Sequence, residues 1–125
     1  MNLLLDTQIV IWWRTRDPRL SQAAMAAITN AGSVFVSAVS VIEAAIKISL
    51  GKLKLPEPFS VGVDQSGFSR LPVTFEHGER LRVLPMHHRD PFDRLLIAQA
   101  LEEGLTLLTS DGALKRYRVP IVLAK

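Results

Sequence analysis

We predict from the sequence an α/β domain of three layers, in which a parallel sheet is flanked by helices. Short apolar runs of strand length alternate with longer helix-forming stretches along the chain. These runs are apolar at nearly every position, which is typical of parallel strands buried on both faces. The chain has 125 residues, 48% of them hydrophobic, and can bury a core of its own, so we expect one domain over residues 1–125.

The first three expected elements are a strand and two helices. Residues 2–5 form an apolar run that stops at a polar pair, which predicts a short buried strand. Residues 7–14 follow as a helix. A turn at an Asp-Pro pair then precedes an alanine-rich helix over residues 20–31, with Ser21 as its candidate N-cap and Gly32 as its stop.

The middle of the chain continues the alternation of strands and helices. Residues 34–38 are β-branched and aromatic, which predicts a second strand, and residues 39–50 form a long helix. A further helix is expected within residues 57–67, after a connector that contains proline. Residues 71–74 are a candidate third strand, and Pro72 predicts an edge position because proline cannot donate a ladder hydrogen bond.

The best-defined helix lies at residues 91–103. Asp90 is a candidate N-cap, Pro91 occupies the first helical position, and Gly104 follows as the C-terminal cap. The other elements expected in this part of the chain are a helix at 75–83, a strand at 105–109, a short helix at 112–117 and a last strand at 120–123.

Acidic side chains occur where this fold brings them to one edge of the sheet. Asp6 follows the first strand, and Asp111 follows the strand before the last short helix. Both are expected at the carboxyl ends of parallel strands, where ligands bind in open sheets. Glu43 is the only charged residue in a long apolar window, and Asp93 lies in the first turn of the best-defined helix. We expect the side chains of Asp6, Glu43 and Asp93 to converge within metal-ligating reach.

Each acid also has an ordinary structural role open to it. Asp6 and Asp111 can cap the helices that follow them, Asp93 can complete a capping box begun by Asp90, and Glu43 can pair with a lysine one turn later. Clustered together, the carboxylates would repel one another unless a cation intervened. Oxygen ligands suit a hard cation such as magnesium or manganese, and an ion of that kind promotes phosphodiester hydrolysis.

Basic residues and histidines offer a weaker signal. A net charge of +3 permits nucleic-acid binding, and the arginines of residues 80–94 form either a solvated surface or an RNA-binding face. His87 and His88 are adjacent and face different ways on a regular element, so we expect them at the surface or against RNA and not as a pair of metal ligands. On the RNA-binding interpretation, the lysines that join this path are Lys47, Lys52 and Lys54.

Several classes of site and location are excluded or disfavoured. The sequence has no phosphate-binding loop, no H-E-x-x-H, no G-x-S-x-G and no G-x-G-x-x-G. It has no cysteine, which excludes disulfides and cysteine-based zinc sites and suits a reducing cytosol. No targeting signal and no apolar run of membrane-spanning length is visible, so we expect a soluble cytoplasmic protein that does not contact membranes.

Four segments together resemble the PIN-domain family and, within it, the VapC-type toxins of toxin–antitoxin systems. They are LLLDT at residues 3–7, VSAVSVIEAAIK at 36–47, DPFDRLLIAQA at 90–100 and LLTSD at 107–111. The resemblance implies a PIN-like parallel sheet flanked by helices and a magnesium- or manganese-dependent endoribonuclease. It also implies an RNA substrate, a cognate antitoxin that inserts a peptide segment beside the active site, and a homodimer.

The resemblance further implies the residues of the site. The family's acidic residues carry over onto Asp6, Glu43, Asp93 and Asp111, as catalytic residues and as metal ligands. The family's small hydroxyl near the last acid carries over onto Thr109.

Two other functions stay open on the sequence. One is a phosphatase or phosphotransferase with Asp6 as an aspartyl nucleophile, although Gln8 stands where such enzymes usually have a second acid. The other is a non-catalytic RNA-binding module on a nuclease fold, although all the expected acids are present. A requirement for divalent cations separates the nuclease from the silent module.

Overall fold

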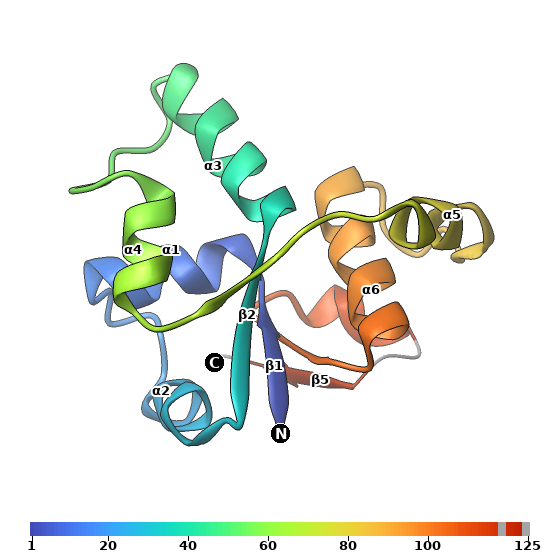
Figure 1. Cartoon of the computed structure of the whole chain (residues 1–125), viewed down its shortest axis with the longest axis horizontal. Helices are drawn as coiled ribbons and strands as arrows, with labels where there is room; N and C mark the ends of the chain where they lie inside the picture. The colour runs from blue at the N-terminus through green and yellow to red at the C-terminus, as the bar shows by residue number, and fades with distance from the viewer. Residues whose placement is uncertain (118–119, 124–125) are drawn as a thin grey trace.

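A five-stranded parallel sheet with the strand order β3-β2-β1-β4-β5 forms the centre of the molecule (Figure 1). The computed structural model describes residues 1–117 and 120–123. The predicted fold class, a parallel sheet between helices, is confirmed. In chain order the elements are β1 (Asn2–Leu5), α1 (Thr7–Thr15), α2 (Gln22–Asn30), β2 (Ser33–Ser37), α3 (Ala38–Ser49), α4 (Phe59–Gln65), β3 (Ser69–Leu71), α5 (Phe75–Val83), α6 (Pro91–Glu103), β4 (Thr106–Thr109), the 3-10 helix η1 (Gly112–Arg116) and β5 (Ile121–Leu123).

The central strand β1 separates two hydrophobic cores. Leu3 and Leu5 pack with α1, α2 and α4 on one face, whereas Leu4 packs with α6 and η1 on the other, because successive side chains of a strand point to opposite faces. All three leucines are 0% exposed, which explains why the strand is apolar on both of its faces. In Figure 1, α1, α2 and α4 lie on one side of the sheet and α5 and α6 on the other.

The register of the central strands builds one level edge. Leu5 pairs with Val36 of β2 and with Leu108 of β4, so the next residue of each strand, Asp6 and Thr109 among them, lies at the same carboxyl edge. The backbone N–H of Asp6 donates to the carbonyl oxygen of Leu108 at 3.0 Å and extends the pairing by one step. Helices α1 and α3 and the 3-10 helix η1, which follow β1, β2 and β4, begin at this edge.

Helix caps explain which element boundaries the sequence predicts well. Asp90 accepts from the N–H of Phe92, Pro91 opens α6, and Gly104 ends it in the left-handed conformation at φ 66°, as predicted. Ser21 caps α2, also as predicted. The third strand differs: β3 ends at Leu71, before Pro72, because the proline has no N–H for the ladder. Its edge position is confirmed.

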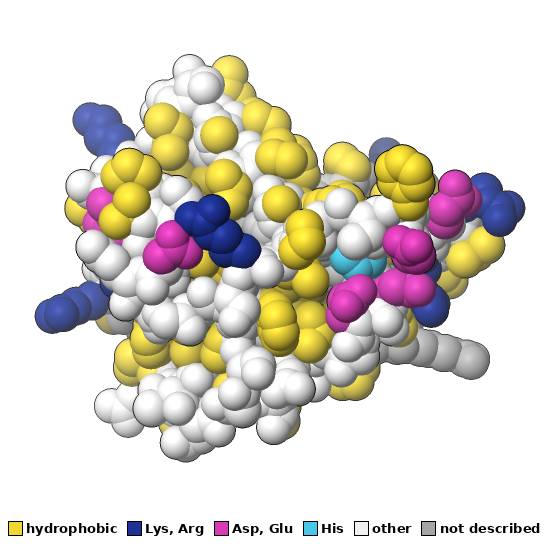
Figure 2. All heavy atoms as spheres, in the orientation of Figure 1, with side chains coloured by type: hydrophobic (Ala, Val, Ile, Leu, Met, Phe, Trp, Pro, Cys, Tyr) yellow, Lys and Arg dark blue, Asp and Glu magenta, His cyan; other side chains and the backbone are white. Residues whose placement is uncertain are grey.

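Helix α3 carries an exposed apolar face. Large hydrophobic side chains cover α3 in Figure 2, where a folded monomer would usually present polar ones. No helix among the described residues is long and apolar enough to cross a membrane. The large exposed hydrophobic side chains of α3 are Val41, Ile42, Ile46 and Ile48, and Leu50 follows at its C-cap.

Candidate active site

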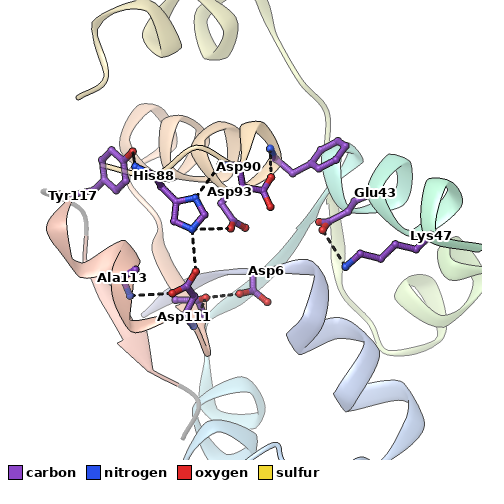
Figure 3. Close-up of polar contacts among 11 residues, drawn as sticks. Asp6, Glu43, Lys47, His88, Asp90, Asp93, Asp111, Ala113 and Tyr117 are labelled. Carbon is purple, nitrogen blue, oxygen red and sulfur yellow. Dashed lines mark hydrogen bonds and ion pairs between the residues drawn. The ribbon is translucent and has the colours of Figure 1, made fainter. Parts of the chain in front are cut away.

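The four predicted acids come from four different places in the chain and meet at the carboxyl edge of the sheet. Asp6 precedes α1, Glu43 lies in α3, Asp93 lies in the first turn of α6, and Asp111 precedes η1. Figure 3 shows their carboxylates facing a common space. The sequence separations explain why only the folded chain can assemble this arrangement.

Asp6 is the most enclosed of these acids, at 7% exposed. Its Oδ1 accepts the backbone N–H of Ile9 at 3.0 Å, so it caps α1, and its Oδ2 accepts the hydroxyl of Thr109. Burial raises the pKa of the Asp6 carboxyl, and the negative charge of Glu43 raises it further; the hydrogen bonds from Thr109 and Ile9 act in the opposite direction. Asp6 is therefore both a cap and a member of the acidic cluster.

Asp93 is half-buried and carries the clearest electrostatic signature of the site. The pKa of Asp93 is raised to about 7, chiefly by burial and in addition by the negative charges of Asp90, Asp6 and Glu43, while His88 acts in the opposite direction. The capping-box interpretation of Asp93 is wrong. In such a box the side chain accepts the N-cap backbone N–H, but the N–H of Asp90 donates to Nδ1 of His88 at 3.1 Å.

Glu43 and Lys47 form the expected pair one helical turn apart. Their Oε2 and Nζ atoms lie 3.3 Å apart, and the Glu43 side chain is 13% exposed. Nearby, the hydroxyl of Thr7 donates to that of Ser40 at 2.9 Å and joins the first turn of α1 to the first turn of α3. This buried hydroxyl pair fixes the start of α1 against the helix that carries Glu43. Its only signal in the sequence is two small polar residues in apolar surroundings.

Thr109 connects Asp6 with Asp111. Its buried hydroxyl donates to Asp6 and accepts the backbone N–H of Asp111 at 3.1 Å. Asp111 caps η1 by accepting the N–H of Ala113 at 3.0 Å, and its side chain is 41% exposed. The hydroxyl thus donates one hydrogen bond and accepts one within the site.

His88 is the site residue that sequence reasoning missed. We expected it at the surface or against RNA, but its Nε2 lies 3.2 Å from Oδ2 of Asp111 and 3.6 Å from Oδ2 of Asp93. The expectation fits His87 better: it is exposed, and its ring packs edge-on against Tyr117 with the ring centres 5.1 Å apart. The segment before α6 has no regular structure, so no periodicity could reveal which histidine turns inward.

The closest grouping of candidate ligands differs from the predicted one. Within the described part of the chain, one group of three residues has ligand atoms that all lie within 4.8 Å of one another, namely His88, Asp93 and Asp111. Asp6 and Glu43 face the same space but do not form such a group with Asp93, so their place among the ligands of a metal stays a prediction. Glu43 is paired instead with Lys47 in this conformation.

The predicted basic path is partly occupied by internal contacts. Arg80 pairs with Glu102 at 2.6 Å, and Arg94 is half-buried and donates to the carbonyl oxygen of Leu84 at 3.0 Å. Arg82 and Arg89 are exposed. Only the exposed members of this segment have their guanidinium groups available for a ligand in this conformation.

The chemistry of the donor set fits a divalent cation. The donors are carboxylate oxygens, which hard cations prefer, and the pKa of Asp93 is raised first by burial and then by the negative charges of Asp90, Asp6 and Glu43. A divalent cation among Asp6, Glu43, Asp93 and Asp111 would offset this repulsion.

Comparisons with known proteins agree with the fold. A family model described as the PIN domain matches residues 3–120. The chain is 32% identical over 122 residues to ribonuclease VapC22 of Mycobacterium tuberculosis, covering 95% of this chain and 94% of that protein. Among solved structures, VapBC2 of Rickettsia felis, bound to a promoter DNA fragment, matches with a TM-score of 0.75 at 17% identity over 100% of both chains. FitAcB of Neisseria gonorrhoeae matches with a TM-score of 0.65 at 20% identity over 95% of each chain.

Proposed function

This chain belongs to the PIN-domain family, and from that membership we propose that it is the toxin of a toxin–antitoxin pair and acts as a metal-dependent endoribonuclease. The observation that carries the proposal is the meeting of carboxylates from four separate elements at one edge of the sheet (Figure 3). The likeness to ribonuclease VapC22 over nearly the whole chain supports the choice of RNA as substrate.

The residues proposed to act are Asp6, Glu43, Asp93 and Asp111, which would hold Mg²⁺ or Mn²⁺. When bound, such a cation stabilises charge on a phosphate and activates water for attack. Hydrolysis then forms a bond between phosphorus and the water oxygen, breaks the bond to the leaving sugar oxygen, and transfers one proton of the water to that oxygen. Thr109 donates to Oδ2 of Asp6 and so orients this carboxylate.

The phosphatase alternative is disfavoured by the surroundings of Asp6. A nucleophilic carboxylate needs an oxygen that can reach phosphorus. Asp6 is nearly buried, and each of its oxygens accepts a hydrogen bond, one from Ile9 and one from Thr109. These contacts are typical of a carboxylate with a fixed orientation, and they disfavour Asp6 as a nucleophile.

The proposed partners are RNA, a cognate antitoxin and a second copy of this chain. The similar structures described as VapBC2 and FitAcB support the antitoxin, and the exposed apolar face of α3 supports a protein interface. An RNA-cleaving toxin acts where its substrate is, so we place it in the cytoplasm.

Asp6→Asn tests this function directly. The amide keeps the shape of the side chain but removes the charge that holds a cation, so RNA cleavage should fall by about a hundredfold or more and growth arrest on expression should be relieved. The measurement is cleavage of total RNA across a Mg²⁺ and Mn²⁺ titration. Asp64→Asn, in an exposed pair with Arg70, is the matched control and should cleave normally. Equal cleavage by parent and Asp6→Asn, or RNA binding without any cation-dependent cleavage, would contradict a metal nuclease.

A further inference from the structure

We propose that His88 is a positioning residue of the acidic centre, which joins Asp93 to Asp111 through its Nε2–H and does not itself bind the metal. The inference rests on the proposed function, because it assigns a role within the same site. It starts from the geometry of one imidazole ring, whose two nitrogens face different groups (Figure 3).

The hydrogen bond at Nδ1 fixes where the proton of the ring lies. Nδ1 accepts the backbone N–H of Asp90 at 3.1 Å. A nitrogen that accepts an N–H carries no proton of its own, and a neutral imidazole has one N–H. The proton of His88 therefore lies on Nε2, the nitrogen that faces the carboxylates.

A protonated Nε2 is a donor and not a ligand. Metal-binding histidines usually donate their second N–H to a carboxylate or carbonyl, which leaves the ligating nitrogen free of a proton. His88 has the opposite arrangement, since its second nitrogen accepts. Nε2 instead donates to Oδ2 of Asp111 at 3.2 Å and attracts Oδ2 of Asp93, 3.6 Å away.

Two hydrogen bonds besides those at Nε2 hold His88 in place. The backbone N–H of His88 donates to the hydroxyl of Tyr117 at 3.0 Å, and Tyr117 is 4% exposed. Nδ1 holds the N-cap of α6 through Asp90. His88 thereby connects the start of α6, which carries Asp93, with the segment around η1, which carries Asp111.

Asp111 depends on this connection more than the other acids do. Its side chain is the most exposed of the three grouped residues, and its other hydrogen bond is the local cap on Ala113. Without the Nε2–H between them, Asp111 and Asp93 would repel and separate. His88 thus holds the two carboxylates in place before a cation arrives.

The first test concerns the metal-free protein and needs no activity. Two-bond proton–nitrogen correlation spectra of the full chain should show His88 with its proton on Nε2. A proton on Nδ1 would overturn the proposal. Mn²⁺ bound to protein that carries ¹⁵N-labelled histidine should show no directly coordinated histidine nitrogen in electron spin-echo modulation, and a coordinated nitrogen would overturn it as well.

The second test compares variants by their affinity for Mn²⁺ alone, measured by electron paramagnetic resonance. His88→Ala should weaken Mn²⁺ binding by about tenfold or more, as loss of an outer partner of a metal ligand typically does. His88→Gln should restore most of the affinity, because its amide N–H can take the place of Nε2–H. His87→Ala, beside it and exposed, is the control and should bind as the parent does.

The outcomes separate this proposal from the proposed function. If the parent binds Mn²⁺ but cleaves no RNA, the nuclease fails while the His88 series still decides the role of the ring. Equal affinity in the parent and His88→Ala refutes the positioning role whatever the cleavage result. Thermal unfolding shows whether His88→Ala is folded. If it is not, His88→Gln decides the question, with Glu43→Gln as the reference for the loss of a proposed ligand. A folded His88→Gln protein that binds Mn²⁺ as weakly as Glu43→Gln overturns the proposal. A parent that binds no Mn²⁺ overturns both.

Discussion

At the scale of single residues, the site depends on polar groups that have two duties. Asp6 caps α1 and faces the cluster, Asp111 caps η1 and faces the cluster, and Thr109 both donates and accepts. An N-cap side chain is held in one orientation by the backbone N–H groups of the helix that donate to it. The same contacts that begin the helices therefore aim the carboxylates.

Replacing Thr109 should reveal this double use. Thr109→Val removes the hydroxyl while keeping the shape, so it leaves Oδ2 of Asp6 and the N–H of Asp111 without their partner. We expect a loss of about 1–3 kcal/mol in the free energy of unfolding and a marked loss of cleavage. Urea unfolding of metal-free protein measures the first. Thr109→Ser keeps the hydroxyl and should retain most of the cleavage; a serine variant as inactive as the valine variant would argue against this role.

Asp93 should make the stability of the metal-free protein depend on pH. Its pKa is raised from the ordinary 3.8 to about 7 in the folded protein, chiefly by burial. A raised carboxyl pKa stabilises the fold fully below the unfolded value, and this contribution is lost as pH rises through the folded value. Asp93→Asn lacks the charge, so its melting temperature relative to the parent should increase between about pH 4 and pH 7 and then level off.

Melting curves in a chelator at pH 5 and pH 8 measure this difference. Addition of Mn²⁺ at pH 8 should raise the melting temperature of the parent more than that of Asp93→Asn, since the carboxylate is the proposed ligand. Parent and variant curves that run parallel across this pH range would contradict the electrostatic account of Asp93.

At the scale of elements, the sequence identifies a helix well where its caps are explicit. The Asp-Pro start and glycine end of α6 give its bounds without error, and an apolar run that stops at a polar pair identifies β1 from four residues. The sequence also indicates that Asp6 follows β1 and so lies at the edge of the sheet, whereas the role of the acids as metal ligands stays a prediction. His88 and the Thr7–Ser40 pair were not predictable, since each depends on how separate segments approach in space.

We predict that helix α3 is the element through which two copies of the chain associate. Ile42 and Ile46 lie one turn apart and are 52% and 45% exposed. Ile46→Glu places a charge in that face, so it should convert a dimer to a monomer, as measured by sedimentation velocity. Met25→Glu, on α2 and 41% exposed, is the matched control and should stay dimeric. A dimer that persists in Ile46→Glu would move the interface elsewhere.

At the scale of the whole molecule, the arginines of residues 80–94 divide into those held by internal contacts and those that are exposed. Arg80 and Arg94 are engaged by the protein itself, whereas Arg82 and Arg89 are exposed. We expect the exposed pair to contact phosphates of the RNA. Binding of RNA to the inactive Asp6→Asn protein should weaken steeply with salt.

The double variant Arg82→Ala with Arg89→Ala should reduce the slope of that salt dependence by about one for each phosphate that an arginine no longer neutralises. Fluorescence anisotropy across a range of potassium chloride concentrations measures it. Arg16→Ala is the control, because Arg16 is exposed and lies at the C-terminal end of α1, away from Asp6. An unchanged slope in the double variant would remove these arginines from the RNA path.

The contact between Asp6 and Thr109 joins residues 103 positions apart. Asp6 is synthesised well before Thr109, and β4 must pair beside β1 before the two side chains can meet. A nascent chain that has not yet reached β4 therefore holds Asp6 without the hydroxyl that donates to it, and without Asp93 or Asp111 in their folded places. The proposed centre can therefore form only after translation has passed Asp111, so a shorter nascent chain lacks the full set of acids proposed to cleave RNA.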